Sequence, residues 1–537
     1  MPRLTGGQAV IASLRAHGVD TIFGIPGVHT LPLYDAMLDE PGLRHVLARH
    51  EQGAGFMADG YARVSGKEGV VSVITGPGVT NIATPVADAY ADSVPLLVIA
   101  SSLPRASRGR RRGELHEVKN QYGVMDSLAG WSRAVEHIEE IPDAIRDAFR
   151  ALRLGRPRGA YVEIPLDLLI MDAELTLPSP APVVLHAPAA RDIAAIAERL
   201  RAAQRPLIIA GDSVTASGAN SQLLRLAELL EAPVVLDSKS RDGLPTDHPL
   251  VITTSGYPLI QETRELIATS DVVLVINNRL GVERPGQNKL LLPASIIQLD
   301  SEPSEIGRLF PVELSAVAGV RLSLDALQAA LQDSPGEHPS RREEVAAAKT
   351  AYEAHARRTY GDNLDFLEAV RQAVPGDGVI VADMTMLGYA SSEHLPLYQP
   401  RTYIHPAELC SIGCGLPLAL GAKVAAPGKP VVALCGDGGF LLNAGELATA
   451  AQEQLDVVIV IFNDSTYTAV KQQQARRFHR RYIATDLRAP DYVTLASAFG
   501  INGLRVASPG DLRSALAESI QQRGSTLIEV TLPPVDW

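Results

Sequence analysis

Short apolar runs alternate with amphipathic stretches through the first third of the chain. The pattern predicts strands at residues 21–23, 45–47, 70–75 and 96–100, with helices around residues 9–16 and 52–65. Strands that are apolar at nearly every position are buried on both faces, as in parallel sheets covered by helices. This third of the chain therefore predicts an α/β domain with a mainly parallel sheet.

The same alternation recurs in the other two thirds. It predicts strands at residues 207–210, 234–236, 272–276 and 296–299, and then at 379–381, 431–435, 457–462 and 527–530. Residues 177–190 and 332–344 interrupt the pattern with prolines, which is typical of linkers. We predict the fold class as α/β, with three consecutive α/β domains at residues 1–176, 190–331 and 345–537.

Composition agrees with a multidomain globular protein. The 537 residues exceed what one hydrophobic core supports, and they are 46% hydrophobic and 20% charged. A net charge of −12 gives no general attraction to nucleic acid or anionic lipid, and no apolar run is long enough to span a bilayer. We therefore expect neither nucleic acid nor membrane as a partner.

The chain has three cysteines, Cys410, Cys414 and Cys435, all in apolar or glycine-rich sequence. The spacing of the first two could indicate a metal or redox site, but no histidine cluster or second pair accompanies them. We expect buried small side chains without disulfides, and a cytoplasmic location.

Glycine turns follow two predicted strands of the first domain. Residues 24–27 (GIPG) and 76–78 (GPG) lie where parallel strands end, and Glu51 follows a third strand. Ligands of such sheets bind at the carboxyl ends of the strands, so we predict a ligand site there that includes Gly27. Taken alone, Glu51 could also be a solvated residue at a helix start.

A second candidate site follows two strands of the last domain. Gly436, Asp437, Gly438 and Gly439 come directly after one strand, where glycines let backbone amides approach a phosphate. Asp464 comes at the end of the next strand, and two carboxylates with phosphate oxygens suit Mg²⁺. The alternative is that Asp437 caps a helix and Asp464 forms a turn.

With 24 residues between Gly438 and Asn463 (463 − 438 − 1), this pattern resembles the thiamine diphosphate (ThDP) enzymes. Their cofactor motif is Gly-Asp-Gly followed at a characteristic distance by Asn-Asn. The resemblance implies Mg²⁺ ligands at Asp437, at Asp464, where the family has asparagine, and at the backbone carbonyl of Thr466. It also implies the domain order pyrimidine-binding, central, diphosphate-binding.

Residues 49–54 (RHEQGA) and 58–63 (ADGYAR) resemble the acetolactate synthase and 2-oxo acid decarboxylase group. The resemblance implies that Glu51 hydrogen-bonds N1′ of the aminopyrimidine, so that N4′ removes the C2 proton and forms the reactive ylid. It implies that Ile412 forces the bent cofactor shape, unless it is a core residue, and that the Cys410 carbonyl accepts from N4′. The family builds its sites across a subunit interface, so a homodimer or homotetramer is expected.

The reaction depends on the segment Leu115-His116-Glu117, where acetolactate synthases read Phe-Gln-Glu. His116 can protonate an enamine intermediate where glutamine cannot, unless it is an ordinary loop residue. With Gln121, the segment is similar to the 5-guanidino-2-oxopentanoate decarboxylase type, and the lysine usual in acetolactate synthases is missing. We therefore predict nonoxidative decarboxylation of a 2-oxo acid; the alternatives are an acetolactate-synthase-like carboligase and, more remotely, a noncatalytic ThDP-binding protein.

Two further segments depart from known patterns. Residues 277–281 (NNRLG) and 211–213 (GDS) replace the flavin-binding pattern of relatives, so we expect no FAD.

Arginines between Arg105 and Arg112 could gather an anionic ligand such as a CoA thioester, although a solvated loop explains them as well. The segment at residues 383–386 indicates no particular substrate.

Overall fold

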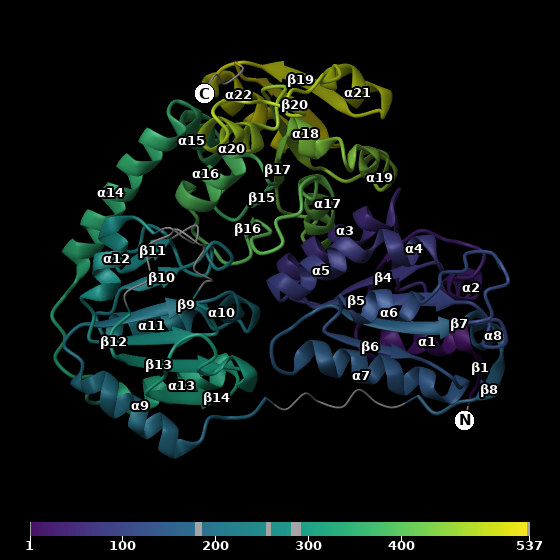
Figure 1. Cartoon of the computed structure of the whole chain (residues 1–537), viewed down its shortest axis with the longest axis horizontal. Coiled ribbons are helices and arrows are strands. Elements are labelled where there is room, and N and C mark those ends of the chain that lie inside the picture. Colours follow the sequence, from purple (N-terminus) through teal and green to yellow (C-terminus); the bar gives the residue numbers. More distant parts are fainter. Residues whose placement is uncertain (1, 178–184, 254–258, 281–291, 534–537) are drawn as a thin grey trace. The chain divides into compact units, whose positions relative to one another are not determined.

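A computed structural model describes residues 2–177, 185–253, 259–280 and 292–533 (Figure 1). Residues 178–184 of the predicted first linker, and Gly281 of the segment compared with flavin-binding relatives, lie outside the described residues. The chain divides into two compact units, one of residues 1–183, 408–506 and 518–537, and one of residues 184–407 and 507–517.

The first unit contains the N-terminal six-stranded sheet, in the order β3-β2-β4-β5-β7-β6. All of its pairs are parallel. Its strands are β2 (Thr21–Gly24), β3 (Arg44–Leu47), β4 (Gly69–Val73), β5 (Leu96–Ser102), β6 (Trp131–Ala134) and β7 (Ala160–Pro165). A separate antiparallel pair joins β1 (Arg3–Thr5) to β8 (Asp172–Glu174).

Helices cover both faces of this sheet (Figure 1). They are α1 (Gly6–Ala16), α2 (Leu31–Leu38), α3 (Glu51–Ser65), α4 (Pro77–Asn81), α5 (Ala83–Asp92), α6 (Gln121–Asp126), α7 (Ile141–Arg153) and α8 (Leu166–Ile170). Helix α3 begins at Glu51 because His50 is extended and its side chain accepts a hydrogen bond from the amide of Gln52. It ends at Gly66, whose φ of 73° is left-handed.

Two glycines allow α3 to pack closely against α17 (Gly415–Ala425), which precedes the predicted diphosphate segment. A Cβ on Gly60 would lie 2.1 Å from the carbonyl oxygen of Leu418, and one on Gly421 would lie 1.8 Å from that of Met57. Each helix thus carries a glycine where the other's backbone passes. This contact ties the helix of Glu51 to the last domain of the same chain.

Substitution of Gly421 by alanine is expected to destabilise the protein by about 1–3 kcal/mol, because its methyl group must push the two helix backbones apart. Alanine would otherwise favour a helix by up to about 1 kcal/mol over glycine. Gly428→Ala is the control, because nothing lies within 4 Å of its Cβ position. Thermal unfolding of both variants tests this expectation, and equal midpoints would contradict it.

The second unit contains the central sheet, with the parallel order β11-β10-β9-β12-β13-β14. Its strands are β9 (Pro206–Ala210), β10 (Val234–Leu236), β11 (Val251–Thr253), β12 (Val272–Ile276), β13 (Ser295–Asp300) and β14 (Leu314–Val317). One face packs against α9 (Ala190–Ala202), α11 (Asn220–Leu229) and α13 (Val320–Leu331). The other packs against α12 (Gln261–Ala268) and α14 (Arg342–Tyr360). A short helix, α10 (Ser213–Ala216), follows β9.

A third sheet of six strands comprises β15 (Val379–Ala382), β16 (Tyr403–Ile404), β17 (Val431–Gly436), β18 (Val458–Asn463), β19 (Asn502–Val506) and β20 (Thr526–Thr531). Strand β15 pairs with β16, and β17, β18, β20 and β19 follow one another in parallel. The remaining helices are α15 (Asn363–Ala373), α16 (Met386–His394), α18 (Asp437–Phe440), α19 (Leu447–Gln452), α20 (Thr468–Arg477), α21 (Tyr492–Ala498) and α22 (Pro509–Gln521).

The structure confirms three parallel-sheet α/β domains and differs from the predictions in detail. Residues 342–344, predicted as linker, begin α14. The segment after β17 forms a short helix, α18, then a 3₁₀ turn (Ala444–Glu446) and α19. Cys410 was predicted to be buried and is exposed, because it lies in the loop between β16 and α17 rather than inside a strand or helix. No described helix is both long and apolar enough to cross a bilayer.

Candidate functional site

Three neighbouring strand ends of the N-terminal sheet bring predicted site residues to one edge. Because the order is β3-β2-β4, the segments that follow these strands share the carboxyl edge. After β3 comes Glu51, after β2 the turn that contains Gly27, and after β4 the turn at Gly76. This edge is the first half of the candidate site.

Glu51 is buried although it is the first residue of a helix. Its side chain retains 9% of its exposure, and Oε2 accepts a hydrogen bond of 2.9 Å from Nδ2 of Asn81, at the end of α4. A solvated residue at a helix start would have neither feature. The β3 and β4 ends therefore hold this carboxylate jointly at the sheet edge.

His116 lies beside the same edge, next to a residue that sequence reasoning missed. Its backbone has a φ of 65°, and its carbonyl passes so close to Gly76 that a Cβ there would lie 2.4 Å away. The His116 ring meets that of His29, in the turn after β2, at a centroid distance of 5.4 Å and an angle of 89°.

The environment of His29 keeps its imidazole neutral. The ring is buried, and its Nδ1 has no hydrogen-bond partner among the described residues. Burial, and next the charge of His116, lower the pKa of His29. Its surroundings therefore favour the uncharged form of the His29 ring.

The second half of the site contains a buried acid, Asp437, at the end of β17 and a half-buried acid, Asp464, at the end of β18. Burial, and next the like charge of Asp464, raise the pKa of Asp437 to about 6. Burial also raises the pKa of Asp464. Oδ2 of Asp437 is buried and has no hydrogen-bond partner among the described residues. Two neighbouring carboxylates repel each other, and a divalent cation between them would relieve this repulsion and bind the unpaired oxygen.

The contacts of Asp464 shape the turn that contains Thr466. Oδ1 accepts from the amide of Thr466 at 3.1 Å, and Oδ2 accepts from the hydroxyl of Thr468. Asp464 thus forms the turn that was one of its two predicted roles. This does not decide its other predicted role, as a ligand of a cation. Among the described residues, no three His, Cys, Asp or Glu side chains form a metal-binding group, so a cation bound between Asp437 and Asp464 would need further oxygen ligands.

The glycines around Asp437 leave room that side chains would fill. Gly436 is the last residue of β17, and α18 begins at Asp437. A Cβ on Gly438 would lie 2.4 Å from the Tyr467 ring. With Gly439, these residues lie at the carboxyl edge of the strand, where glycine backbone suits the close approach of a phosphate group.

Cys410 and Ile412 lie on the loop that precedes α17. Ile412 is 43% exposed, which excludes the alternative of a core isoleucine. The loop is tied to the diphosphate segment because Nδ2 of Asn443 donates to the carbonyl of Gly413 at 2.7 Å. Cys410 and Ile412 are therefore exposed on a loop that the hydrogen bond at Gly413 fixes at its C-terminal end.

A buried glutamate that sequence reasoning missed links the two halves within one chain. Glu446 accepts from the amides of Arg49 (3.1 Å) and His50 (3.0 Å), directly before Glu51. Burial raises the pKa of Glu446. The one sequence feature that could have predicted these hydrogen bonds is the position of Glu446 after the Gly-Asp-Gly motif. Among the described residues, no hydrogen bond joins Glu51 to Asp437.

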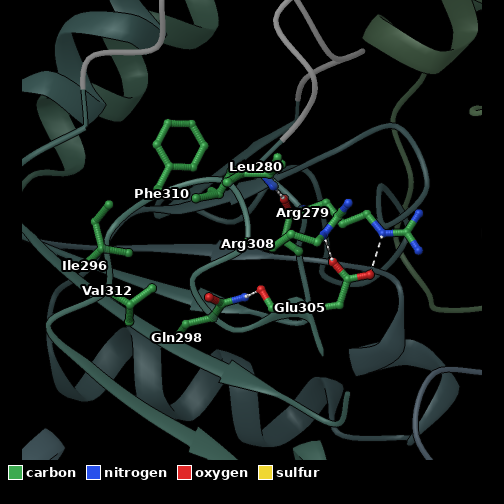
Figure 2. A pocket seen from close by; sticks show the side chains of 10 residues that line it. Arg279, Leu280, Ile296, Gln298, Glu305, Arg308, Phe310 and Val312 are labelled. Carbon is green, nitrogen blue, oxygen red and sulfur yellow. Dashed lines mark hydrogen bonds and ion pairs between the residues drawn. The ribbon is translucent and has the colours of Figure 1, made fainter. Parts of the chain in front are cut away.

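The central domain has a pocket at the carboxyl ends of β12 and β13, shown in Figure 2. Arg279 and Arg308 lie at its edge, and both pair with the buried Glu305, at 3.2 and 2.8 Å. The two guanidinium groups thus share one carboxylate, which compensates one of their two charges. None of the predicted cofactor residues lines this pocket, and the expectation that FAD is absent stays a prediction.

The basic loop is partly engaged by the domain itself. Arg105 pairs with Asp167 at 2.8 Å, and Arg108 pairs with Glu136. Arg110, Arg111 and Arg112 are exposed. This arrangement favours the interpretation of a solvated loop for most of the cluster.

Family models of known proteins match the parts of the chain that contain the two halves of the site. Residues 4–124 match the thiamine pyrophosphate enzyme N-terminal TPP binding domain, 193–327 the central domain, and 383–530 the C-terminal TPP binding domain. Thiamine pyrophosphate is another name for ThDP.

Full-length relatives cover nearly the whole chain. A probable 2-ketoarginine decarboxylase (AruI) of Pseudomonas aeruginosa is 37% identical over 98% of this chain and 94% of its own length. A probable acetolactate synthase large subunit of Methanocaldococcus jannaschii is 30% identical over 99% and 93%. The acetolactate synthase of Mycobacterium bovis is 33% identical over 95% and 85%. The chain belongs to the thiamine pyrophosphate enzymes and is a ThDP-dependent decarboxylase or carboligase of 2-oxo acids.

Proposed function

We propose that this enzyme carries out the ThDP- and Mg²⁺-dependent nonoxidative decarboxylation of a 2-oxo acid. The observation that carries this choice is His116, paired with His29 at the sheet edge that also holds Glu51. When bound, ThDP supplies the C2 carbanion chemistry, through an ylid and an enamine, that no side chain offers. The protein's own groups bind, orient and transfer protons.

The proposed cofactor contacts divide between the two halves. Asp437, Asp464 and the carbonyl of Thr466 would bind Mg²⁺, and the amides around Gly436, Gly438 and Gly439 would bind the diphosphate. Glu51 and the carbonyl of Cys410 would bind the pyrimidine, with Gly27 beside it, and Ile412 would support its bent shape. The unpaired Oδ2 of Asp437 supports this set, because a buried acid without a partner is costly in the absence of a cation.

The imidazole pair supports protonation as the final step. Loss of CO₂ from a 2-oxo acid leaves a carbon that must take up one proton to become an aldehyde. Because the His29 ring is neutral and close to His116, it does not add a second charge, and His116 remains free to bind and deliver that proton. A glutamine at this position could not donate in this way.

Replacement of His116 by glutamine is expected to lower aldehyde formation by about 10²-fold or more and to raise the share of acyloin product, because the proton donor is lost. The His116→Asn variant controls for backbone strain, since asparagine tolerates the left-handed φ of 65°. Both variants should lose activity alike. NMR of the products from pyruvate and 5-guanidino-2-oxopentanoate measures the effect, and unchanged aldehyde yields would refute the role of His116.

The choice of substrates follows from the relatives. One is named a probable 2-ketoarginine decarboxylase, and others are named acetolactate synthases. The compound 5-guanidino-2-oxopentanoate, which is 2-ketoarginine, is therefore the first to test, with pyruvate as the comparison. Accumulation of acetolactate without aldehyde would favour the carboligase alternative, and absence of any turnover would favour the noncatalytic one.

We also propose a homodimer or homotetramer whose site forms across a subunit interface. Within one chain no hydrogen bond among the described residues joins Glu51 to Asp437, and an apolar group lies exposed around Ile412. Its other members are Leu409, Leu441 and Leu442, between 43% and 52% exposed. Such a group is typical of an interface. Sedimentation of the purified protein tests the proposal, and a monomer that binds ThDP would refute it.

A further inference from the structure

Gln121, the first residue of α6, is buried and makes hydrogen bonds from both ends of its side-chain amide. Its Oε1 accepts a hydrogen bond of 2.7 Å from the backbone amide of Gly76, in the turn after β4. Its Nε2 donates to the carbonyl of Ser101 on β5 at 2.9 Å and to Oε2 of Glu163 on β7 at 3.0 Å. One side chain thus connects two neighbouring strands and the turn that follows a third.

The partners of this amide fix its orientation. A backbone N–H donates and a carbonyl accepts, so Oε1 must face Gly76 and Nε2 must face Ser101. Glu163 is 3% exposed, and its Oε2 also accepts from the hydroxyl of Tyr161 at 2.8 Å. Burial raises the pKa of Glu163, and the hydrogen bonds from Tyr161 and Gln121 oppose that rise. Glu163 is therefore a buried acceptor that anchors Gln121.

The turn that Gln121 contacts supports two residues of the candidate site. A Cβ on Gly76 would lie 2.4 Å from the carbonyl oxygen of His116, so the backbone of His116 packs directly on this turn. Gly76 is also the N-cap of α4, whose last residue, Asn81, donates to Oε2 of Glu51. A change in the orientation of the Gly76 peptide would therefore displace His116, Glu51 or both.

A separate contact attaches this turn to β5. The amide of Thr75 donates to the hydroxyl oxygen of Ser101 at 3.0 Å, and the two hydroxyl groups are hydrogen-bonded at 2.9 Å. The turn thus stays attached to the sheet without Gln121. What Gln121 adds is the orientation of the next peptide, at Gly76, whose φ of 71° belongs to the left-handed region.

We propose that Gln121 is a positioning residue that fixes the Gly76 peptide, with Glu163 as its anchor. Because His116 packs on this peptide and α4 begins there, Gln121 sets the relative positions of His116 and Glu51. The consequence for catalysis rests on the proposed function. The effect on the turn does not, because it can be measured without cofactor or substrate.

Hydrogen exchange of the full-length protein without cofactor, resolved to single residues, tests the effect on the turn. Gln121→Met keeps the size of the side chain and removes its amide, and Gln121→Asn keeps an amide that is one methylene too short to reach both sides. In both variants the Gly76 amide should exchange about tenfold faster, because its buried hydrogen bond is lost. The amide of Glu117, in the loop of His116, should lose protection as well.

Two matched variants should behave like the unmodified protein. Glu163→Gln keeps a carbonyl oxygen where Oε2 accepts, so the hydrogen bonds from Gln121 and from Tyr161 can both remain. Tyr122→Phe, next to Gln121 on α6, removes a hydrogen bond to Ser132 that does not involve the turn. A cooperative thermal transition identifies the variants that are folded. The two Gln121 variants differ in size and polarity, so the test does not depend on either one alone.

Product formation from a 2-oxo acid with Mg²⁺ and ThDP tests the consequence for catalysis. In Gln121→Met, kcat for the aldehyde should fall about tenfold while KM changes little, because the proton donor is displaced and the substrate contacts remain. The share of acyloin should rise. A purely structural role would lower the amount of active enzyme without changing KM or the ratio of products.

Unchanged exchange at Gly76 in the Gln121 variants would overturn the inference, and so would an unchanged ratio of aldehyde to acyloin. An equal loss in Tyr122→Phe would also overturn it, because the effect would then belong to α6 as a whole. If Gly76 exchange responds as expected but the unmodified protein decarboxylates no 2-oxo acid, the proposed function fails and the role of Gln121 in the turn stands.

Discussion

Replacement of Glu51 by glutamine should slow turnover by about 10²- to 10⁴-fold, the usual contribution of a positioned proton-transfer group. Glutamine has nearly the same shape, and its amide oxygen can still accept from Asn81, so the fold should persist. What is lost is the acidic proton offered to N1′ of the pyrimidine. The loss should therefore appear in the exchange of the cofactor's C2 proton as well as in turnover.

Rapid-quench NMR of C2 deuterium exchange measures this effect. Glu453→Gln provides a matched control, since Glu453 is also a partly buried glutamate that accepts from the chain before α3, at the amide of Leu47. The control should exchange at the rate of the unmodified protein. Equal rates in Glu51→Gln would remove Glu51 from the mechanism.

Replacement of Asp437 by asparagine should stabilise the apoprotein and reduce the further stabilisation that Mg²⁺ and ThDP give. The folded-state pKa of about 6 lies above the ordinary value of 3.8, so the folded protein binds this proton more tightly than the unfolded chain. Stability is therefore lost as pH rises from about 4 to about 6, by about 1–3 kcal/mol. Asparagine avoids this loss, and the apoprotein variant should be more stable than the unmodified protein at pH 8.

With Mg²⁺ and ThDP present, the variant should gain less stability from the ligands than the unmodified protein does. Asparagine keeps an oxygen but not the charge, and a tenfold weaker cation affinity corresponds to about 1.4 kcal/mol of lost ligand stabilisation at saturating ligand. Thermal unfolding at pH 5 and pH 8, with and without the ligands, measures both effects. Asp486→Asn, at an exposed acid, is the control. An equal ligand-induced shift in all three proteins would show that Asp437 is not a cation ligand.

Local sequence signals were sufficient for the strands and for the glycine turns. The strands at residues 234–236 and 272–276 were predicted with the observed bounds, because strands buried on both faces are apolar at every position. The turns after β2, β4 and β17 followed from glycines at strand ends. Their gathering at sheet edges followed from parallel topology alone.

Residues whose roles depend on distant contacts could not be predicted in this way. His29 has no sequence feature that pairs it with His116, since the pair forms only when the turn after β2 meets the segment between β5 and α6. Residues 342–344 read as linker because prolines precede them, although their charged side chains suit the first turn of α14.

The most direct test of the account is the stoichiometry of the products formed by the purified protein with Mg²⁺, ThDP and a 2-oxo acid. We predict one aldehyde for each CO₂ released, with acyloin as a minor product, because His116 delivers a proton faster than a second carbonyl adds. If CO₂ is released while the remaining fragment appears in acetolactate or another acyloin rather than in aldehyde, the enzyme is a carboligase and the proposed role of His116 is wrong.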